Sequence, residues 1–173
     1  MTHASKRAAS MAVSPPELDR LIAGLHPCSP EQPIARACHW RIGETPVHVR
    51  YANEQVDRGI AFSVEDNPFE ALSVLDPRVV RIAPGACNEK HRHAHESLFV
   101  VLSGSAELEI GNQRQALEQG EVACVPRWVV HQTHNRSAVD PLVLLAITDF
   151  GLTSAALGNY DKQTRLNKSE RNT

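Results

Sequence analysis

The sequence predicts an all-β domain in which short antiparallel strands form a sandwich or a barrel. From residue 78 onward, short runs rich in branched residues each end at glycine or proline, as in RVVRIAPG (78–85) and SLFVVLSG (97–104). No long helical pattern separates these runs, and Gly104, Gly111 and Gly120 stand where turns would join them. Short strands at such regular spacing are typical of antiparallel sandwiches and barrels.

The length of 173 residues suits one domain with terminal extensions. We expect an N-terminal extension over residues 1–36, a β-barrel domain over 37–150 and a C-terminal helix or tail over 151–173. Two prolines precede ELDRLIAGL (17–25), whose apolar residues are spaced for one helical face, so a short helix is expected in the extension. The runs ACHWRIG (37–43) and VHVRYANEQ (47–55) alternate enough to be strands.

Charge and composition argue against several partners. The formal net charge is -2 and the pI is near 6.5, so no strong field would hold nucleic acid or an anionic membrane surface. No apolar run approaches the length of a membrane span, and no signal peptide is evident. The four cysteines include no Cys-x-x-Cys pair, which favours reduced thiols. We therefore expect a cytoplasmic protein.

The most informative stretch is HRHAHESLFVVLSG (91–104), in which three histidines alternate. Side chains at i and i+2 of an extended strand share a face, so His91 and His93 would project together and could bind one metal ion. A third ligand must come from another segment, and GEVACVPRWVVHQTHN (120–135) offers His131 and His134. Burying several imidazoles is unfavourable unless something satisfies them, although packing or surface positions remain the alternative.

These two segments resemble the signature motifs of the cupin superfamily, small β-barrel metalloproteins. The positions that fall on the motifs are Gly85, His91, His93 and Gly104 in the first, and Gly120, Pro126, His131 and Asn135 in the second. The resemblance implies a jelly-roll barrel, usually dimeric, so a homodimer is expected. It also implies one divalent metal ion held by His91, His93 and His131.

The chain departs from the motifs at two positions. Ser97 stands where the family has a glutamate ligand, and Glu96, one position earlier, would face the opposite side of a regular strand. Trp128 replaces the glycine of the second motif. The sequence does not decide whether Ser97 or Glu96 contributes at the metal.

Both departures are shared by the gentisate and salicylate ring-cleaving dioxygenases. The chain is similar to one barrel of those enzymes, which carry two barrels per chain. Other single-barrel three-histidine cupins cleave diketones or phenolic ketones.

The resemblance implies an iron(II) dioxygenase that uses O₂ to cleave a carbon–carbon bond in a small aromatic (phenolic) or dicarbonyl substrate. Three neutral imidazoles leave metal positions open and keep the full positive charge of the ion, which suits an anionic bidentate substrate. The same ligands with Zn²⁺, Ni²⁺ or Mn²⁺ could instead support a non-redox cyclase or isomerase. A non-catalytic cupin that only binds a small molecule is the third alternative.

Three further residues are candidates for catalysis. His95 continues the histidine alternation and could be a fourth ligand, a proton shuttle or an exposed loop residue; we favour the last two. His134 could orient His131 or act as a base, with a surface position as the alternative. Glu89 precedes His91 by two residues and could accept a substrate proton at the rim of the site, although an exposed loop glutamate would look the same.

A substrate pocket is expected beside the ligands. Phe99 and Trp128 are candidates for its apolar wall, with core packing as the alternative for Phe99. Arg127 could pair with a substrate carboxylate, although a regular strand would turn its side chain away from the metal.

Overall fold

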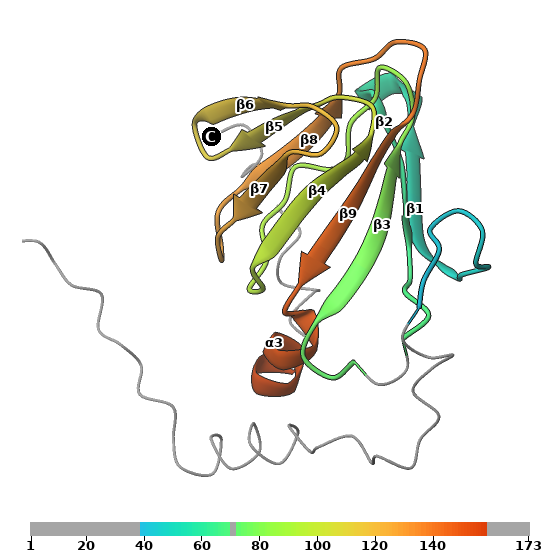
Figure 1. Ribbon diagram of the computed structural model, residues 1–173. Helices are drawn as coiled ribbons and strands as arrows, with labels where there is room; N and C mark the ends of the chain where they lie inside the picture. Colours follow the sequence, from blue (N-terminus) through green and yellow to red (C-terminus); the bar gives the residue numbers. More distant parts are fainter. Residues whose placement is uncertain (1–38, 70–71, 159–173) are drawn as a thin grey trace, which may run out of the picture.

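The structure is a computed structural model that describes residues 39–69 and 72–158 (Figure 1). The expected helix in the 1–36 extension and the tail beyond residue 158 lie outside these ranges. The strands are β1 (Val49–Gln55), β2 (Ile60–Glu65), β3 (Asp76–Ile82), β4 (Ser97–Ser103), β5 (Ala106–Ile110), β6 (Gln113–Leu117), β7 (Val122–Val125), β8 (His131–Asn135) and β9 (Leu142–Thr148). A 3-10 turn, η1 (Val56–Arg58), joins β1 to β2, and helix α3 (Phe150–Leu157) follows β9.

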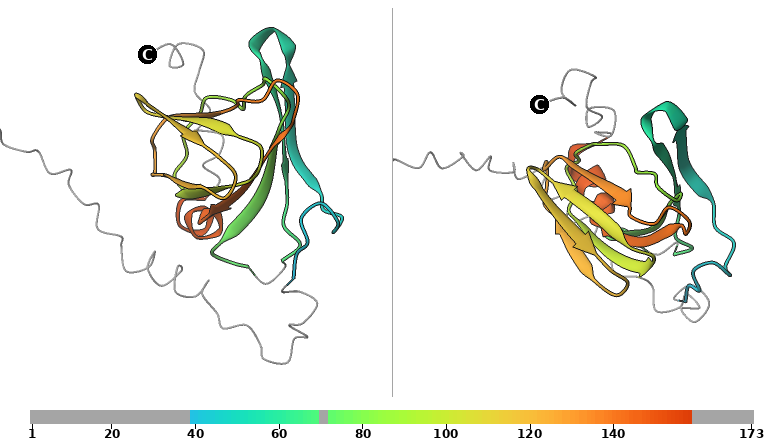
Figure 2. Two further views of the ribbon diagram at one scale, coloured as in Figure 1. Left: turned by 45° about the horizontal axis from the view of Figure 1, so that its top comes forward. Right: turned by 90° about the horizontal axis from the view of Figure 1, so that it is seen from above.

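The strands form two antiparallel sheets that face each other and enclose a barrel interior (Figure 2). The larger sheet has the order β1-β2-β3-β9-β4-β7, and the smaller has the order β6-β5-β8. Strands distant in sequence therefore lie side by side, as β3 and β9 do over seven paired residues. The predicted all-β fold is confirmed, and helix α3 lies at one end of the barrel (Figure 1).

The strand predictions hold for three of the four runs named above. VHVRYANEQ contains β1, and the two runs RVVRIAPG and SLFVVLSG contain most of β3 and all of β4. The strand expected in ACHWRIG is wrong over its described part, residues 39–43. A turn replaces it, in which the carbonyl of Arg41 accepts hydrogen bonds from the backbone N–H groups of Glu44 and Thr45.

The barrel interior changes from apolar to polar along the strands. Residues of β3, β9 and β4 that lie side by side and face inward form successive rows: Ile82 and Leu142; Val80, Leu144 and Val101; Arg78, Ala146 and Phe99; Asp76, Thr148 and Ser97. The first rows belong to the hydrophobic core, and the last row is polar yet buried. Polar side chains that far inside a barrel need internal partners or a ligand.

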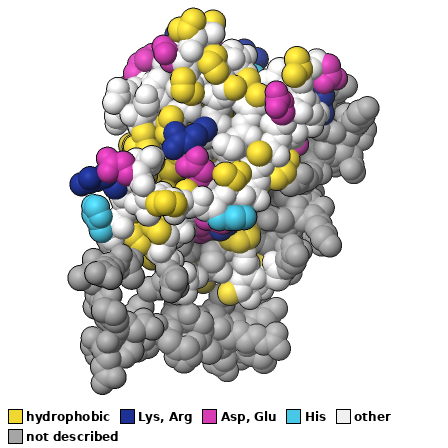
Figure 3. Space-filling model, turned by 90° about the vertical axis from the view of Figure 1, so that its right-hand side faces the viewer, with side chains coloured by type: hydrophobic (Ala, Val, Ile, Leu, Met, Phe, Trp, Pro, Cys, Tyr) yellow, Lys and Arg dark blue, Asp and Glu magenta, His cyan; other side chains and the backbone are white. Residues whose placement is uncertain are grey.

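The outer surface carries no dominant charge. Apolar, basic and acidic side chains are interspersed over the face seen in Figure 3, in keeping with the small net charge. In the ranges that the structure describes, no helix has the length and apolar character needed to span a membrane. The expected homodimer stays a prediction.

Asn135, the last residue of β8, ties three segments together. Its Nδ2 group donates to the carbonyls of Ile82 (3.1 Å), Ala83 (3.1 Å) and Asp140 (2.8 Å). Its Oδ1 atom accepts the N–H of Ser137 at 2.9 Å. The motif asparagine therefore has a structural role at the apolar end of the barrel.

We predict that Asn135→Ala lowers the free energy of unfolding by about 2–4 kcal/mol, because buried carbonyls lose their donor. Urea unfolding would measure this change. Asn112→Ala, in the exposed turn after β5, is the control and should change stability by less than about 0.5 kcal/mol. Equal effects of the two substitutions would contradict this role for Asn135.

Candidate metal centre

The segment between β3 and β4 carries two of the predicted ligands, and it is fastened to the start of β8. His91 and His131 exchange backbone hydrogen bonds of 3.0 and 2.8 Å, and the N–H of Trp128 donates to the carbonyl of His93 at 2.8 Å. The expectation that His91 and His93 lie on a regular strand is wrong, because only His91 makes a strand-like bridge and β4 begins at Ser97. Their convergence is set by these cross-links to the β8 segment.

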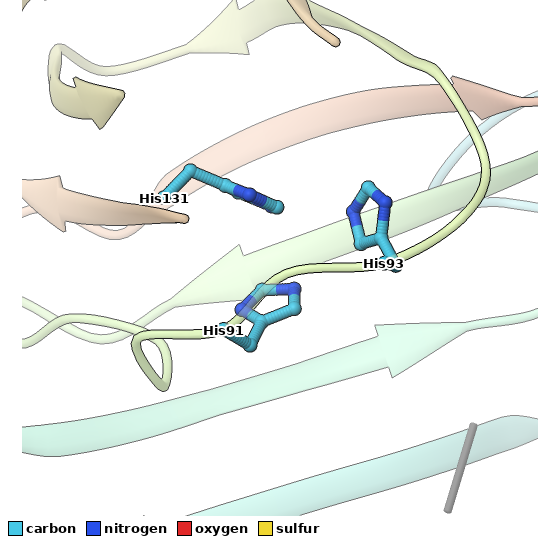
Figure 4. Close-up of side chains that lie close together, drawn as sticks. All are labelled: His91, His93 and His131. Atoms are coloured by element: carbon cyan, nitrogen blue, oxygen red, sulfur yellow. The ribbon is translucent and has the colours of Figure 1, made fainter. Parts of the chain in front are cut away.

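The three imidazoles of His91, His93 and His131 point toward one another (Figure 4). Their candidate ligand atoms all lie within 4.8 Å of one another, and the ring centroids of His91 and His131 are 4.4 Å apart. Each ring places Nδ1 next to a backbone carbonyl two residues away: Glu89 for His91 (2.7 Å), His95 for His93 (2.8 Å) and Val129 for His131 (2.9 Å).

These carbonyl contacts fix the protonation pattern of the rings. A carbonyl oxygen can only accept, so each Nδ1 carries the hydrogen and a neutral ring leaves its Nε2 lone pair free to bind a metal. The Nε2 atom of His131 is buried and has no hydrogen-bond partner in the described part of the chain. A buried nitrogen of this kind requires a ligand, and a metal ion would satisfy it.

Burial keeps His93 and His131 neutral. It lowers the pKa of His93 to about 3, and the nearby rings of His95 and His91 add to this shift. Burial also holds the pKa of His131 well below its ordinary value, with further contributions from His91 and His93. A neutral imidazole is the form that binds a metal ion, so protons do not compete for the site at neutral pH.

A cavity of about 360 Å³ opens beside these rings on the polar side of the barrel. Its wall is formed by Arg50, Tyr51, Phe62, Val64, Arg78, Val80, Asn88, Glu89, His91, His93, His95, Ser97, Phe99, Ala146 and Thr148. Most of its aromatic and aliphatic members come from β2, β3, β4 and β9. The cavity thus has a flat apolar wall, a histidine face and two arginines.

Residues 78–148 match the family model of the cupin domain. The chain is similar to this family over these residues. A cupin-2 domain structure from Rhodospirillum rubrum superposes with a TM-score of 0.59 at 17% identity, over 78% of this chain and 83% of that one. A cupin 2 conserved barrel domain protein from Rhodopseudomonas palustris gives 0.52 at 21% identity, over 60% and 71%. At these identities the likeness concerns the fold.

A curated relative is similar within the same region. The 1-hydroxy-2-naphthoate 1,2-dioxygenase of Nocardioides sp. (strain KP7) is 27% identical over 78 residues, which are 45% of this chain and 20% of the relative. The chain therefore spans about a fifth of the length of this relative. The resemblance of the cupin domain to a dioxygenase, predicted from its motifs, is confirmed.

The donor set of this cupin domain is three imidazoles without a carboxylate. Within the described ranges, the cluster that could hold a metal consists of the three histidines and includes no aspartate or glutamate. The side chain of Glu96 is 60% exposed and lies 3.6 Å from Arg127, away from the cavity. Ser97 lines the cavity instead, and its buried Oγ has no partner in the described residues. An ion with three nitrogen ligands and open positions fits this arrangement.

His95 is a buried part of the site. Its ring stacks on that of His93 with centroids 3.6 Å apart and planes 10° apart, and its other neighbour is Phe150, whose centroid lies 5.6 Å away. The expectation of an exposed loop residue is wrong, because only 5% of His95 is accessible. Burial, followed by the charge of Arg78, lowers the pKa of His95 to about 3. The ring is neutral and lines the cavity next to a ligand.

Glu89 lines the cavity with both carboxylate oxygens held. Asn53 donates to Oε1 at 2.6 Å, and the Tyr51 hydroxyl donates to Oε2 at 3.2 Å. Both donors come from β1, and the main-chain carbonyl of Glu89 also receives the Nδ1 hydrogen of His91. The carboxylate is therefore oriented rather than mobile.

Two residues expected in the substrate pocket lie elsewhere. Arg127 is not part of the cavity wall; its guanidinium pairs with Asp149 and donates to the carbonyl of Ala94 at 2.7 Å. Trp128 is 50% exposed and likewise does not line the cavity. Its φ of 61° lies in the left-handed region, which explains why the family motif has glycine here. Phe99 does line the cavity, 6.2 Å from the ring of His131.

His134 is directed away from the metal site. Along β8 the buried residues alternate as His131, Thr133 and Asn135, so His134 belongs to the opposite face. It pairs across the sheet with Glu107 on that face. The expectation that His134 orients His131 or acts as a base in the cavity is therefore wrong.

Three residues that line the cavity were not identified from the sequence: Arg50, Tyr51 and Arg78. The sequence could have indicated Arg78, because alternate residues of a strand share a face and Arg78 alternates with the core residues Val80 and Ile82. Arg50 and Tyr51 lie on β1, whose alternation indicates no buried face.

We predict that the metal-loaded protein binds one divalent ion per chain and that His91→Ala, His93→Ala or His131→Ala weakens binding more than about 100-fold, because each removes a ligand. Metal content after dialysis against buffered free metal would measure this. His134→Ala, on the other face of β8, is the matched control and should bind metal normally. Retention of metal by His131→Ala, or its loss from His134→Ala, would contradict the assignment.

We predict that the metal-free protein loses stability as the pH falls from about 6.5 toward about 3. The pKa values of His93 and His95 are about 3 in the folded chain, against roughly 6.5 when unfolded. The unfolded chain therefore binds protons first, which reduces the free energy of unfolding by up to about 1.4 kcal/mol per pH unit for each histidine.

Urea unfolding between pH 7.5 and 4.5 checks this dependence. His95→Gln should reduce its slope, whereas His48→Gln, whose side chain is 80% exposed, should not. Constant stability across this range would show that these rings are not held neutral.

Proposed function

We propose that the cupin domain is a mononuclear non-haem iron(II) dioxygenase that cleaves a carbon–carbon bond in a small aromatic (phenolic) or dicarbonyl compound. The observation that carries this proposal is the cluster of three imidazoles, without a carboxylate, of which His91 and His93 line the cavity. Neutral ligands leave the ion its full charge, which favours an ionised bidentate substrate. The named activity of the Nocardioides relative also supports a dioxygenase.

Iron(II) held by His91, His93 and His131 would supply the charge that holds the ionised substrate and a path for electrons from that substrate to O₂. The chain supplies the surroundings. Phe62 and Phe99 offer flat apolar surfaces for a ring on the cavity wall. Glu89 is held by Tyr51 and Asn53 at the cavity wall, where it would accept the proton that the substrate hydroxyl gives up on binding.

His95 would then act on the substrate rather than on the metal. Its ring is neutral, lines the cavity and stacks on His93, so a ligand in the cavity could contact it. A neutral imidazole can accept a proton or a hydrogen bond from a substrate hydroxyl. The same three ligands with zinc or nickel would support isomerisation or cyclisation, which needs no oxygen.

We predict that protein loaded with iron(II) under anaerobic conditions consumes O₂ when given gentisate, a catechol or a β-diketone from a substrate panel. An oxygen electrode and product analysis by mass spectrometry would measure uptake and incorporation of both oxygen atoms. His93→Ala should abolish turnover, by more than about 1000-fold, and His134→Ala should retain it.

Iron-loaded protein that remains inert to O₂ across the panel would contradict the dioxygenase. Turnover of a panel compound in the strict absence of O₂ would instead indicate the non-redox enzyme.

A further inference from the structure

Two arginines share the cavity with the histidines. Arg78 lies on the inward face of β3, in the same row as Ala146 and Phe99, and its side chain is only 16% exposed. Arg50 reaches the same cavity from β1, with 37% of its side chain exposed. A guanidinium stays charged at any pH at which the protein is folded, so both positive charges persist inside the barrel.

Both guanidiniums donate hydrogen bonds to one carboxylate, and each also has N–H groups that this carboxylate does not use. Oδ2 of Asp76 accepts from Arg78 Nε (3.0 Å), Arg78 Nη2 (2.6 Å) and Arg50 Nη1 (2.9 Å). The Nε group of Arg50 pairs with Asp66. Arg78 Nη1 and Arg50 Nη2 have no partner among the residues that the structure describes. Asp76 and Asp66 thus fix the orientation of the two side chains and leave these terminal N–H groups to bind a ligand.

A short series of rings connects Arg78 to the candidate metal centre. The Cζ atom of Arg78 lies 4.6 Å from the centroid of the Phe150 ring, which packs edge-on against His95. His95 in turn stacks on the ligand His93 at 3.6 Å. The end of the cavity that carries the two arginines therefore adjoins the histidine face, and both belong to the wall of one cavity.

We propose that Arg78 and Arg50 form a subsite that binds the carboxylate of an anionic ligand while another oxygen of that ligand faces the three histidines. This proposal deepens the proposed function by naming the substrate as a small organic acid. It rests on the proposed function only for the end of the ligand that would react at the histidines. The planar fork of a guanidinium matches two carboxylate oxygens. Two aspartates already balance the two arginine charges, so one further negative charge fits better than the two of a phosphate ester.

Equilibrium binding to the metal-loaded full chain, without O₂, tests this subsite. The probes are benzoate, benzamide of the same shape but no charge, and phenyl phosphate. Benzoate should bind at least about 10-fold more tightly than either, and Arg78→Met should remove that advantage because it deletes a charge-assisted hydrogen bond. Arg81→Met is the matched control, since Arg81 pairs with Glu65 on the outer face of the same strand and should leave benzoate affinity within about twofold.

Arg78→Lys keeps the positive charge opposite Asp76. It is the variant to test if Arg78→Met does not fold. It should lose most of the preference for benzoate, because an ammonium lacks the guanidinium fork. Equal affinities for benzoate and benzamide, or unchanged benzoate affinity in both Arg78 variants, would overturn the proposal. Tighter binding of phenyl phosphate would overturn the carboxylate assignment. Binding is measured without turnover, so protein that binds benzoate yet never consumes O₂ would refute the dioxygenase and leave the subsite standing.

Discussion

The candidate metal centre depends on one repeated interaction, the hydrogen bond from Nδ1 of each ligand histidine to a nearby backbone carbonyl. For His91, His93 and His131 the accepting carbonyl is two residues away, so the local chain orients its own side chain. These bonds select one tautomer and turn each Nε2 toward the same point. The reciprocal backbone bridge between His91 and His131 then holds the two ligand segments in register. These contacts within the chain preorganise the three rings, which lowers the entropic cost of assembling the site.

The polar site and the apolar core lie at different ends of the barrel, so the site does not interrupt the core. Ile82, Leu142 and Leu144 fill one end, and polar residues occupy the inward positions at the other. At the polar end, Asp76 is kept ionised: burial raises its pKa, but the hydrogen bonds and charges of Arg78 and Arg50 outweigh burial and lower it. Helix α3 follows the polar end directly, and Asp149 at its start pairs with Arg127. The residue expected to bind substrate thus holds the end of the barrel in place.

The sequence was sufficient to predict features that depend on the spacing of residues along the chain. It was not sufficient for features that depend on how distant segments pack together. The turn glycines and the short strand-like runs were enough to predict the all-β fold, and the two motifs were enough to predict that His91, His93 and His131 lie together. The alternation of faces along a regular strand correctly predicted that Glu96 points away from the site, and Ser97 faces the cavity. It could not be applied to His95, which follows a segment with no regular pairing; this ring is buried and packs against His93 and Phe150.

The cavity arginines show a further limit of sequence reasoning. Arg127 was chosen because it lies within the second motif, close to His131 in the sequence. Arg78 lies 53 positions before His131 and reaches the cavity through the pairing of β3 with β9. Which strands become neighbours is a property of the fold, and it decides which charges share an interior.

The tautomer of the three ligand histidines is the most direct test of this account. Nitrogen-15 and proton NMR of the ring nitrogens in metal-free protein at neutral pH distinguishes the two neutral tautomers from each other and from imidazolium. The account predicts that His91, His93 and His131 are neutral, with Nδ1 protonated and Nε2 unprotonated. Rings that carry the proton on Nε2, or that are doubly protonated, would contradict it, because the nitrogen that should bind the metal would then be occupied.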